Sequence, residues 1–183
     1  METRERILKA AYSCFSKRGF IGATTKDIAR EAGISEVTLF RHFKSKRELF
    51  EEVLNRFSVL PDIEKIGARE EAPRRELLRE AALQILKSLK EKKCFIKILL
   101  SEVSLYSQEV RRIYQRFLEK LDGLIAQILK CDRELARSFH SALFGYFLSE
   151  EIFMGRELTE EEIERFVDKL TSLYIRGEDE EGN

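Results

Sequence analysis

The chain has 183 residues, which is enough for one or two domains with a substantial buried core. Charged residues make up 36% of the chain, and the chain has only two prolines. The abundance of Leu, Glu, Lys, Arg and Ala predicts an all-α protein. The chain has three cysteines without paired spacing (Cys14, Cys94 and Cys131), which argues against a disulfide-rich class. It shows no signal-peptide pattern, and its longest uncharged run, residues 138–149, is too short to span a membrane. We therefore expect a cytoplasmic protein with reduced thiols and no membrane partner.

The formal net charge of zero conceals an uneven distribution. Residues 1–57 hold 12 Lys and Arg against 8 Asp and Glu, whereas residues 58–183 hold 21 against 25. A basic front part suggests a polyanionic partner, although a difference of four charges is modest and also arises by chance.

The first predicted helix covers residues 3–18. Ile7, Ala11 and Phe15 recur at a spacing of four residues, which places them on one buried face. Gly19 and Gly22 follow and are expected to form the exit from this helix.

Three short helices are predicted next. Thr24 followed by Asp27 indicates a capping box at the start of the second helix, and Gly33 is expected to end that helix in a left-handed conformation. A third helix begins near Ser35. A fourth begins at Ser45, where Glu48 completes a second capping box.

The stretch that contains Pro61 and Pro73 is predicted to be a joint, with room for one short helix between the prolines. Helices are then expected over residues 74–91, 93–106, 108–130, 133–155 and 159–176, the last opened by a capping box of Thr159 and Glu162. This organisation predicts a domain over residues 1–57, a helical domain over 58–176, and a disordered acidic tail over 177–183.

The second and third helices have the sequence form of a helix-turn-helix. Ala29 is small enough for the two helices to cross closely, and Gly33 supplies the positive φ of the sharp turn. The side chains expected to point inward are Ile28, Ile34, Leu39 and Phe43. Those expected to point outward or to the flanks, where a short helix can enter the major groove of DNA, are Glu36, Val37, Thr38, Phe40, Arg41 and His42.

The stretch "GATTKDIAREAGISEVTLFRHFKSKRELF", with "ILKAAYSCFSKRGF" before it, resembles the DNA-binding domain of the TetR family of transcriptional regulators almost without a gap. The resemblance implies an N-terminal three-helix helix-turn-helix domain, and a C-terminal helical domain for effector binding and dimerisation. It also implies contacts to phosphate from Thr25, Lys26, His42 and Lys46, a helix cap from Ser35, and a base or phosphate contact from Thr38. Arg41 is the residue we expect to read a base, because guanidinium suits guanine O6 and N7. The positions expected to contact DNA are Thr25, Lys26, Ser35, Glu36, Val37, Thr38, Phe40, Arg41, His42 and Lys46.

Two of these positions depart from the family pattern. Phe40 stands where tyrosine is usual, so a hydroxyl contact to the DNA backbone is lost and the ring is free to touch a thymine methyl group. Glu36 adds a carboxylate that repels phosphate but accepts a hydrogen bond from cytosine N4. Aromatic residues at helical spacing are usually core and basic runs are usually solvated. Here the helix caps, the glycine of the turn, the inward apolar side chains and the outward polar side chains all indicate DNA binding.

The helix around "RSFHSALFGYFLSEEIFMG" is apolar on more than one side, which predicts burial against a second copy of the chain. Ser141, Gly145 and Ser149 form a line of small residues suited to a close helix approach, and the last predicted helix carries one apolar stripe. The TetR resemblance implies a two-fold four-helix bundle; the alternative is a monomer with a tight core. The residues expected at the dimer interface are Phe139, Leu143, Tyr146, Phe147, Phe166, Leu170 and Leu173.

The resemblance also implies an effector pocket in the C-terminal part, while the same residues would equally fill an ordinary core. The residues expected to line it are Phe95, Ile98, Leu99, Glu102, Tyr106, Tyr114, Phe117, Leu121 and Phe144, with Glu102 and the two tyrosines as polar anchors.

The sequence therefore predicts a homodimeric regulator that binds an operator with two-fold related half-sites and is released by an apolar or amphipathic small molecule. The alternative is a constitutive architectural or occlusion factor controlled by a protein partner. An enzyme is not expected: His42 and His140 are the two histidines, no catalytic or phosphate-binding motif occurs, and no Cys/His cluster has metal-binding spacing. We expect neither a cofactor nor a metal.

Overall fold

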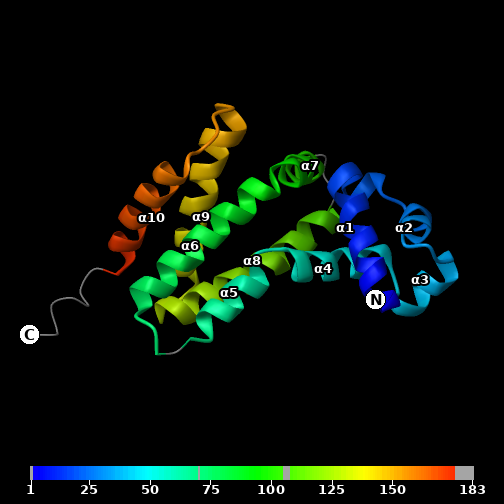
Figure 1. The fold of residues 1–183 in the computed structure, drawn as a ribbon, viewed down its shortest axis with the longest axis horizontal. Helices are drawn as coiled ribbons and strands as arrows, with labels where there is room; N and C mark the ends of the chain where they lie inside the picture. The colour runs from blue at the N-terminus through cyan, green and yellow to red at the C-terminus, as the bar shows by residue number, and fades with distance from the viewer. Residues whose placement is uncertain (1, 70, 105–107, 176–183) are drawn as a thin grey trace, which may run out of the picture. The chain divides into compact units, whose positions relative to one another are not determined.

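The computed structural model describes residues 2–69, 71–104 and 108–175, and every regular element among them is a helix, which confirms the all-α prediction (Figure 1). Predicted positions at residue 106 and in the tail 177–183 lie outside the described residues. No helix in the described ranges is long and apolar enough to cross a bilayer. The helices are α1 (Thr3–Gly22), α2 (Thr25–Glu31), α3 (Glu36–His42), α4 (Lys46–Phe57), α5 (Leu60–Gly67), α6 (Arg74–Glu91), α7 (Lys93–Ser104), α8 (Gln108–Leu129), α9 (Arg133–Phe147), the π-helix η1 (Leu148–Phe153) and α10 (Glu160–Tyr174).

Contacts between residues divide the chain into two compact units. Unit 1 joins Met1–Ser58 to Lys92–Leu118, and unit 2 joins Val59–Glu91 to Glu119–Asn183. Each unit is therefore built from segments that are distant in sequence. The functional domains expected from the sequence, 1–57 and 58–176, remain a prediction.

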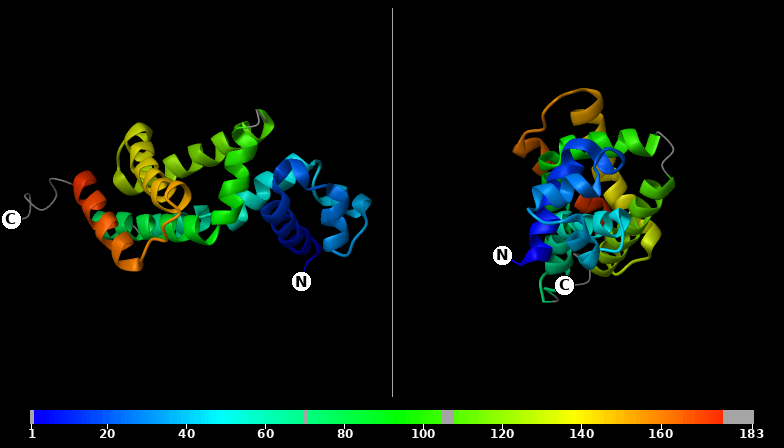
Figure 2. Two further views of the ribbon diagram at one scale, coloured as in Figure 1. Left: turned by 90° about the horizontal axis from the view of Figure 1, so that it is seen from above. Right: turned by 90° about the vertical axis from the view of Figure 1, so that its right-hand side faces the viewer.

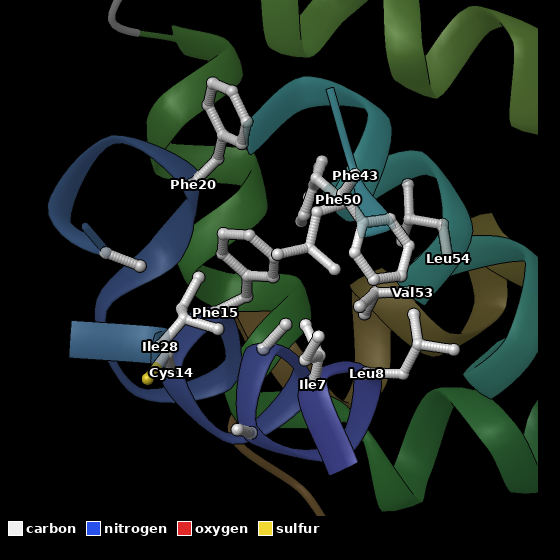
Figure 3. Close-up of a cluster of buried hydrophobic side chains, with 14 of the residues drawn as sticks. Ile7, Leu8, Cys14, Phe15, Phe20, Ile28, Phe43, Phe50, Val53 and Leu54 are labelled. Atoms are coloured by element: carbon white, nitrogen blue, oxygen red, sulfur yellow. The ribbon is translucent and has the colours of Figure 1, made fainter. Parts of the chain in front are cut away.

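The core of unit 1 lies between α1, α4 and α7 (Figure 3). Ile7, Ala11 and Phe15 of α1 are all fully buried, as the four-residue spacing predicts. The ring centroids of Phe15 and Phe50 lie 4.8 Å apart in an edge-on contact, a favourable geometry for aromatic pairs. Phe95 of α7 closes this core with its ring 6.2 Å from that of Phe50.

Helix α1 extends to Gly22, four residues beyond the end predicted at residue 18. Gly19 interrupts it with φ 73° and ψ −178°, and the helical turn resumes as far as Gly22. A residue with a Cβ rarely adopts this left-handed φ, so glycine is what allows the kink.

The helix caps follow the sequence signals closely. Thr159 and Glu162 form the complete reciprocal capping box. The hydroxyls of Thr24 and Ser45 each accept a bond from the amide three residues on, as expected. The second half of these two boxes differs: Asp27 accepts from the Thr24 hydroxyl rather than from its amide, and Glu48 accepts from the amide of Lys44.

In unit 2, α6 packs against α5, α9 and α10 (Figure 2). The predicted helix over 133–155 is α-helical only to Phe147 and continues as η1. Glu151 in η1 is almost fully buried, and its carboxylate accepts a hydrogen bond from the amide of Leu158 and lies 3.8 Å from Nζ of Lys90. The wider turn thus accompanies a buried carboxylate that holds the chain leading into α10.

Candidate nucleic-acid interface

The turn between α2 and α3 is built as the helix-turn-helix pattern predicts. Gly33 has φ 65°, and the amide of Ile34 donates to the carbonyl of Ala29 across the turn. Ile28 and Leu39 are completely buried, and Phe43 is 1% exposed. These inward side chains fix the face that α3 turns outward.

Two arginines of α1 hold this motif and were not identified from the sequence. Nη2 of Arg6 donates to the carbonyl oxygens of Ala32 and Gly33, at 2.5 and 3.2 Å, where the C-terminus of α2 leaves carbonyls without helical partners. The guanidinium of Arg4 lies 5.1 Å from the ring centre of Phe43, just after α3. Arginine is so common in this charged chain that neither position carries a local signal.

The outward face of α3 combines apolar and cationic groups. Val37 is 66% exposed and Phe40 is 45% exposed, although both are large hydrophobic residues. Arg41 and His42 are also exposed, while Thr38 is half-buried and shares a hydrogen bond with the Ser35 hydroxyl, the cap of this helix. Exposed apolar groups beside cationic groups suit the major groove, where thymine methyls and base acceptors lie together.

The first turn of α2 adds Thr25 and Lys26. Lys26 is exposed, and the Thr25 hydroxyl donates to the carboxylate of Glu36 at 2.5 Å. Glu36 therefore has a partner inside the protein, which links the first turns of α2 and α3. The structure thus brings nine of the predicted positions together in the helix-turn-helix.

Lys46, at the start of α4, is half-buried and also bonded inside the protein. Its Nζ donates to the carbonyl of Ala23 at 3.1 Å and lies 4.5 Å from the ring centre of Phe20. An ammonium group carries three donors, so this arrangement leaves donors available for a phosphate.

Beside this surface, Asp27 binds two basic side chains. The pKa of Asp27 lies below its ordinary value, first because of the hydrogen bond from Thr24 and also because Arg18 and Arg30 lie at 2.9 and 2.6 Å. Asp27 therefore holds both guanidinium groups next to the first turn of α2.

The predicted effector-binding residues fall into both units. Phe95 and Leu99 are buried in the core of unit 1, where Tyr114 and Phe117 pack with ring centres 5.7 Å apart, and Ile98 is half-buried. Burial raises the pKa of Tyr114 to about 12. In unit 2 Leu121 is buried and Phe144 is half-buried, while Tyr106 lies outside the described residues. Glu102 is 6% exposed, and both of its carboxylate oxygens accept backbone hydrogen bonds.

The predicted interface residues divide into core and surface. Phe139, Leu143 and Phe147 are fully buried within one chain, and Leu170 is 7% exposed, so these side chains offer no appreciable surface to a partner. Neighbouring helices of their own unit cover them, and the expectation that they lie at a dimer interface stays a prediction. Tyr146 and Phe166 are half-buried and stack with ring centres 3.9 Å apart, and Leu173 is 56% exposed.

Comparison with known proteins gives the same picture as the geometry. Residues 7–53 match the family model described as bacterial regulatory proteins, tetR family. An uncharacterised HTH-type transcriptional regulator of Bacillus subtilis, YvkB, is 28% identical over 191 residues, which cover 96% of each chain. The HTH-type transcriptional repressor KstR2 of Mycolicibacterium smegmatis is 44% identical over 54 residues, 30% of this chain and 26% of that protein.

A solved structure extends the likeness to the whole fold. The multidrug binding protein EbrR, crystallised with imidazole, superposes with a TM-score of 0.62 at 20% identity, over 93% of this chain and 95% of that one. The helix-turn-helix geometry, the family match and the full-length likeness agree. Residues 7–53 thus carry a DNA-binding domain of the tetR family of bacterial regulatory proteins, and over its full length the chain is similar to an HTH-type transcriptional regulator.

Proposed function

We propose that this regulator is a repressor that binds, as a homodimer, an operator with two-fold related half-sites and is released by an apolar or amphipathic small molecule. The observation that carries the DNA-binding part is the outward face of α3, where Val37, Phe40, Arg41 and His42 are exposed while Leu39 is fully buried. The repressor assignment draws support from KstR2, which is a repressor.

Each exposed group on this surface has a proposed role. Arg41 reads guanine, and Phe40 and Val37 contact thymine methyl groups. Lys26, His42 and Lys46 bind phosphates, helped by the N-terminal dipoles of α2 and α4 in the case of the two lysines. The Thr25 hydroxyl and Thr38 supply neutral contacts beside them.

The dimer is proposed to form through the exposed face of α9 together with Leu173 of α10. Ser141, Gly145 and Ser149 are exposed on one side of α9 and η1, and a Cβ added at Gly145 would meet nothing within 4 Å. Glycine in a helix costs about 1 kcal/mol relative to alanine, and close approach of a second helix offsets that cost. A two-fold dimer would present two α3 helices about 34 Å apart, one turn of DNA.

The effector is proposed to bind near the predicted residues of α7 and α8. EbrR is a multidrug binding protein with the same fold, which supports an apolar or amphipathic ligand class. A ligand that favours one arrangement of α7 would shift operator affinity by about 1–3 kcal/mol, the usual range of coupling between sites.

A second candidate is a constitutive DNA-binding factor controlled by a protein partner. The burial of Phe95 and Leu99 in the core of unit 1 favours it, because side chains that fill a core do not line a cavity.

Selection of bound duplexes from a random pool tests the DNA-binding proposal, and sedimentation of the complex gives its stoichiometry. We expect enrichment of an inverted repeat bound by two chains. Titration of the complex with a panel of apolar and amphipathic compounds then separates the two candidates. Release by at least one compound supports the repressor with an effector, whereas unchanged affinity throughout favours the constitutive factor.

A further inference from the structure

Glu102 binds the backbone of a helix that lies more than 80 residues earlier in the chain. Its Oε2 atom accepts from the amide of Phe20 at 3.0 Å, and its Oε1 atom accepts from the amide of Ile21 at 2.7 Å. The side chain is 6% exposed. Hydrogen bonds from two amides to one buried carboxylate are strong, because the acceptor is ionised and largely shielded from water.

The kink at Gly19 makes these two amides available. In an uninterrupted helix each amide donates to the carbonyl four residues earlier, but Gly19 with φ 73° breaks that ladder. A Cβ on Gly19 would lie 2.3 Å from Oε1 of Glu102 and 2.7 Å from Cγ2 of Ile98. The glycine therefore serves both the unusual backbone angle and the close approach of α7.

The same short segment is also held by α4. Nζ of Lys46 donates to the carbonyl of Ala23 and lies over the ring of Phe20. Residues 20–23 are thus bonded to α7 through Glu102 and to α4 through Lys46. Thr24 then caps α2, so the fixed segment leads directly into the turn that carries Thr25 and Lys26.

We propose that Glu102 is a positioning residue for DNA binding: it fixes residues 20–23 and, through them, the phosphate-contacting first turn of α2. This inference rests on the proposed phosphate contact of Lys26. It makes α7 part of the DNA-reading unit, in agreement with the contacts that place Lys92–Leu118 in unit 1.

The test uses the full chain and a duplex selected by the wild-type protein. Glu102→Gln keeps the size of the side chain but removes its charge and replaces one acceptor by a donor. We expect operator binding about tenfold weaker and faster exchange of the Phe20 and Ile21 amide protons by NMR. Glu109→Gln, the same change at an exposed site of α8, should leave both unchanged.

A double-mutant cycle with Lys26→Ala separates positioning from general destabilisation. If Glu102 acts through the first turn of α2, Glu102→Gln should cost about tenfold in the wild-type background but only about threefold in the Lys26→Ala background. Equal losses in the two backgrounds would overturn the positioning role. Should Glu102→Gln fail to fold, Glu102→Asp, which keeps the charge but is too short to reach both amides, enters the same cycle.

The outcomes for this inference and for the proposed function differ. If the Lys26→Ala variant binds the operator as tightly as wild type, with an unchanged salt dependence, the proposed phosphate contact is contradicted. Glu102→Gln that binds as tightly as wild type, with amide exchange unchanged, contradicts the positioning role alone.

Discussion

The hydroxyl of Thr25 donates a hydrogen bond to the carboxylate of Glu36, joining the first turn of α2 to the first turn of α3. Both helices of the helix-turn-helix are thus tied together at the ends expected to meet DNA. The acceptor is ionised, so this tie places a negative charge beside the proposed phosphate contacts.

Glu36→Gln should strengthen binding to DNA of mixed sequence. Glutamine still offers an oxygen to Thr25, but the repulsion of phosphate disappears; about 1 kcal/mol, or about fivefold in affinity, is expected at low salt and less at high salt. Fluorescence anisotropy at two salt concentrations measures it, with Glu109→Gln as the charge-matched control. Weaker binding by Glu36→Gln would show that the carboxylate contributes an attractive base contact instead.

Lys46→Ala should affect DNA binding and folding together. Loss of a phosphate contact lowers the slope of log affinity against log salt by about 0.9 per chain. Loss of the bond to Ala23 and of the contact with Phe20 lowers the free energy of unfolding by about 2 kcal/mol. Salt titrations and urea unfolding measure the two effects, and Lys44→Ala, at an exposed neighbouring position, should leave unfolding unchanged. An unaltered salt slope in Lys46→Ala would remove its phosphate role.

Arg41→Ala should relax sequence preference at one position in each half-site. A good bidentate contact to guanine discriminates against other bases by about 1–3 kcal/mol, so the enriched sequences should lose one conserved guanine while the others persist. Repeating the selection from a random pool with the variant measures this. A uniform loss of affinity with the same consensus would instead place Arg41 on a phosphate.

Acid should weaken the start of α10. The amide of Thr159 and the side chain of Arg156 lower the pKa of Glu162 to about 2, below its ordinary value of 4.5. A lowered pKa in the folded state means that the stabilisation is complete above about 4.5 and is lost as the pH falls towards 2. Glu162→Gln should therefore flatten the dependence of unfolding temperature on pH between these values, and Glu161→Gln, at an exposed position in the same turn, should not. Parallel pH profiles for wild type and Glu162→Gln would contradict the assignment.

Gly145→Leu should disrupt self-association without unfolding the protomer. The new side chain points into open space within one chain, and leucine favours helix by nearly 1 kcal/mol over glycine. Against a partner helix it overpacks the contact, and the dimer dissociation constant should rise at least about tenfold. Sedimentation velocity measures this, with Lys87→Leu on the exposed face of α6 as control. A dimer as tight as wild type would exclude α9 from the interface.

The elements that were correctly predicted depend on neighbours in sequence. The capping box of Thr159 and Glu162 requires only residues three apart, and the face of α3 follows from Gly33 and the spacing of Leu39 and Phe43. Because these interactions join residues within one or two helical turns, they can be predicted from the spacing of residue types in the sequence.

What the sequence did not reveal depends on distant partners. Glu102 was expected to be a polar anchor in a pocket, yet its carboxylate binds amides more than 80 residues away. The bonds from Arg6 to Ala32 and Gly33 span 26 and 27 residues. Likewise, a helix that is apolar all round is buried, but periodicity does not say whether its own chain or a second copy covers Phe139 and Leu143.

The discontinuity of unit 1 has a consequence for synthesis on the ribosome. Residues 1–58 emerge first, but Phe95, Leu99, Val110 and Ile113, which complete their core, are translated later. Residues 1–58 would therefore keep an uncovered apolar surface until residues 92–118 have been made. During this period, capture by chaperones competes with folding. Residues 1–58 are made first, yet their core is complete only after residues 92–118 have also been made.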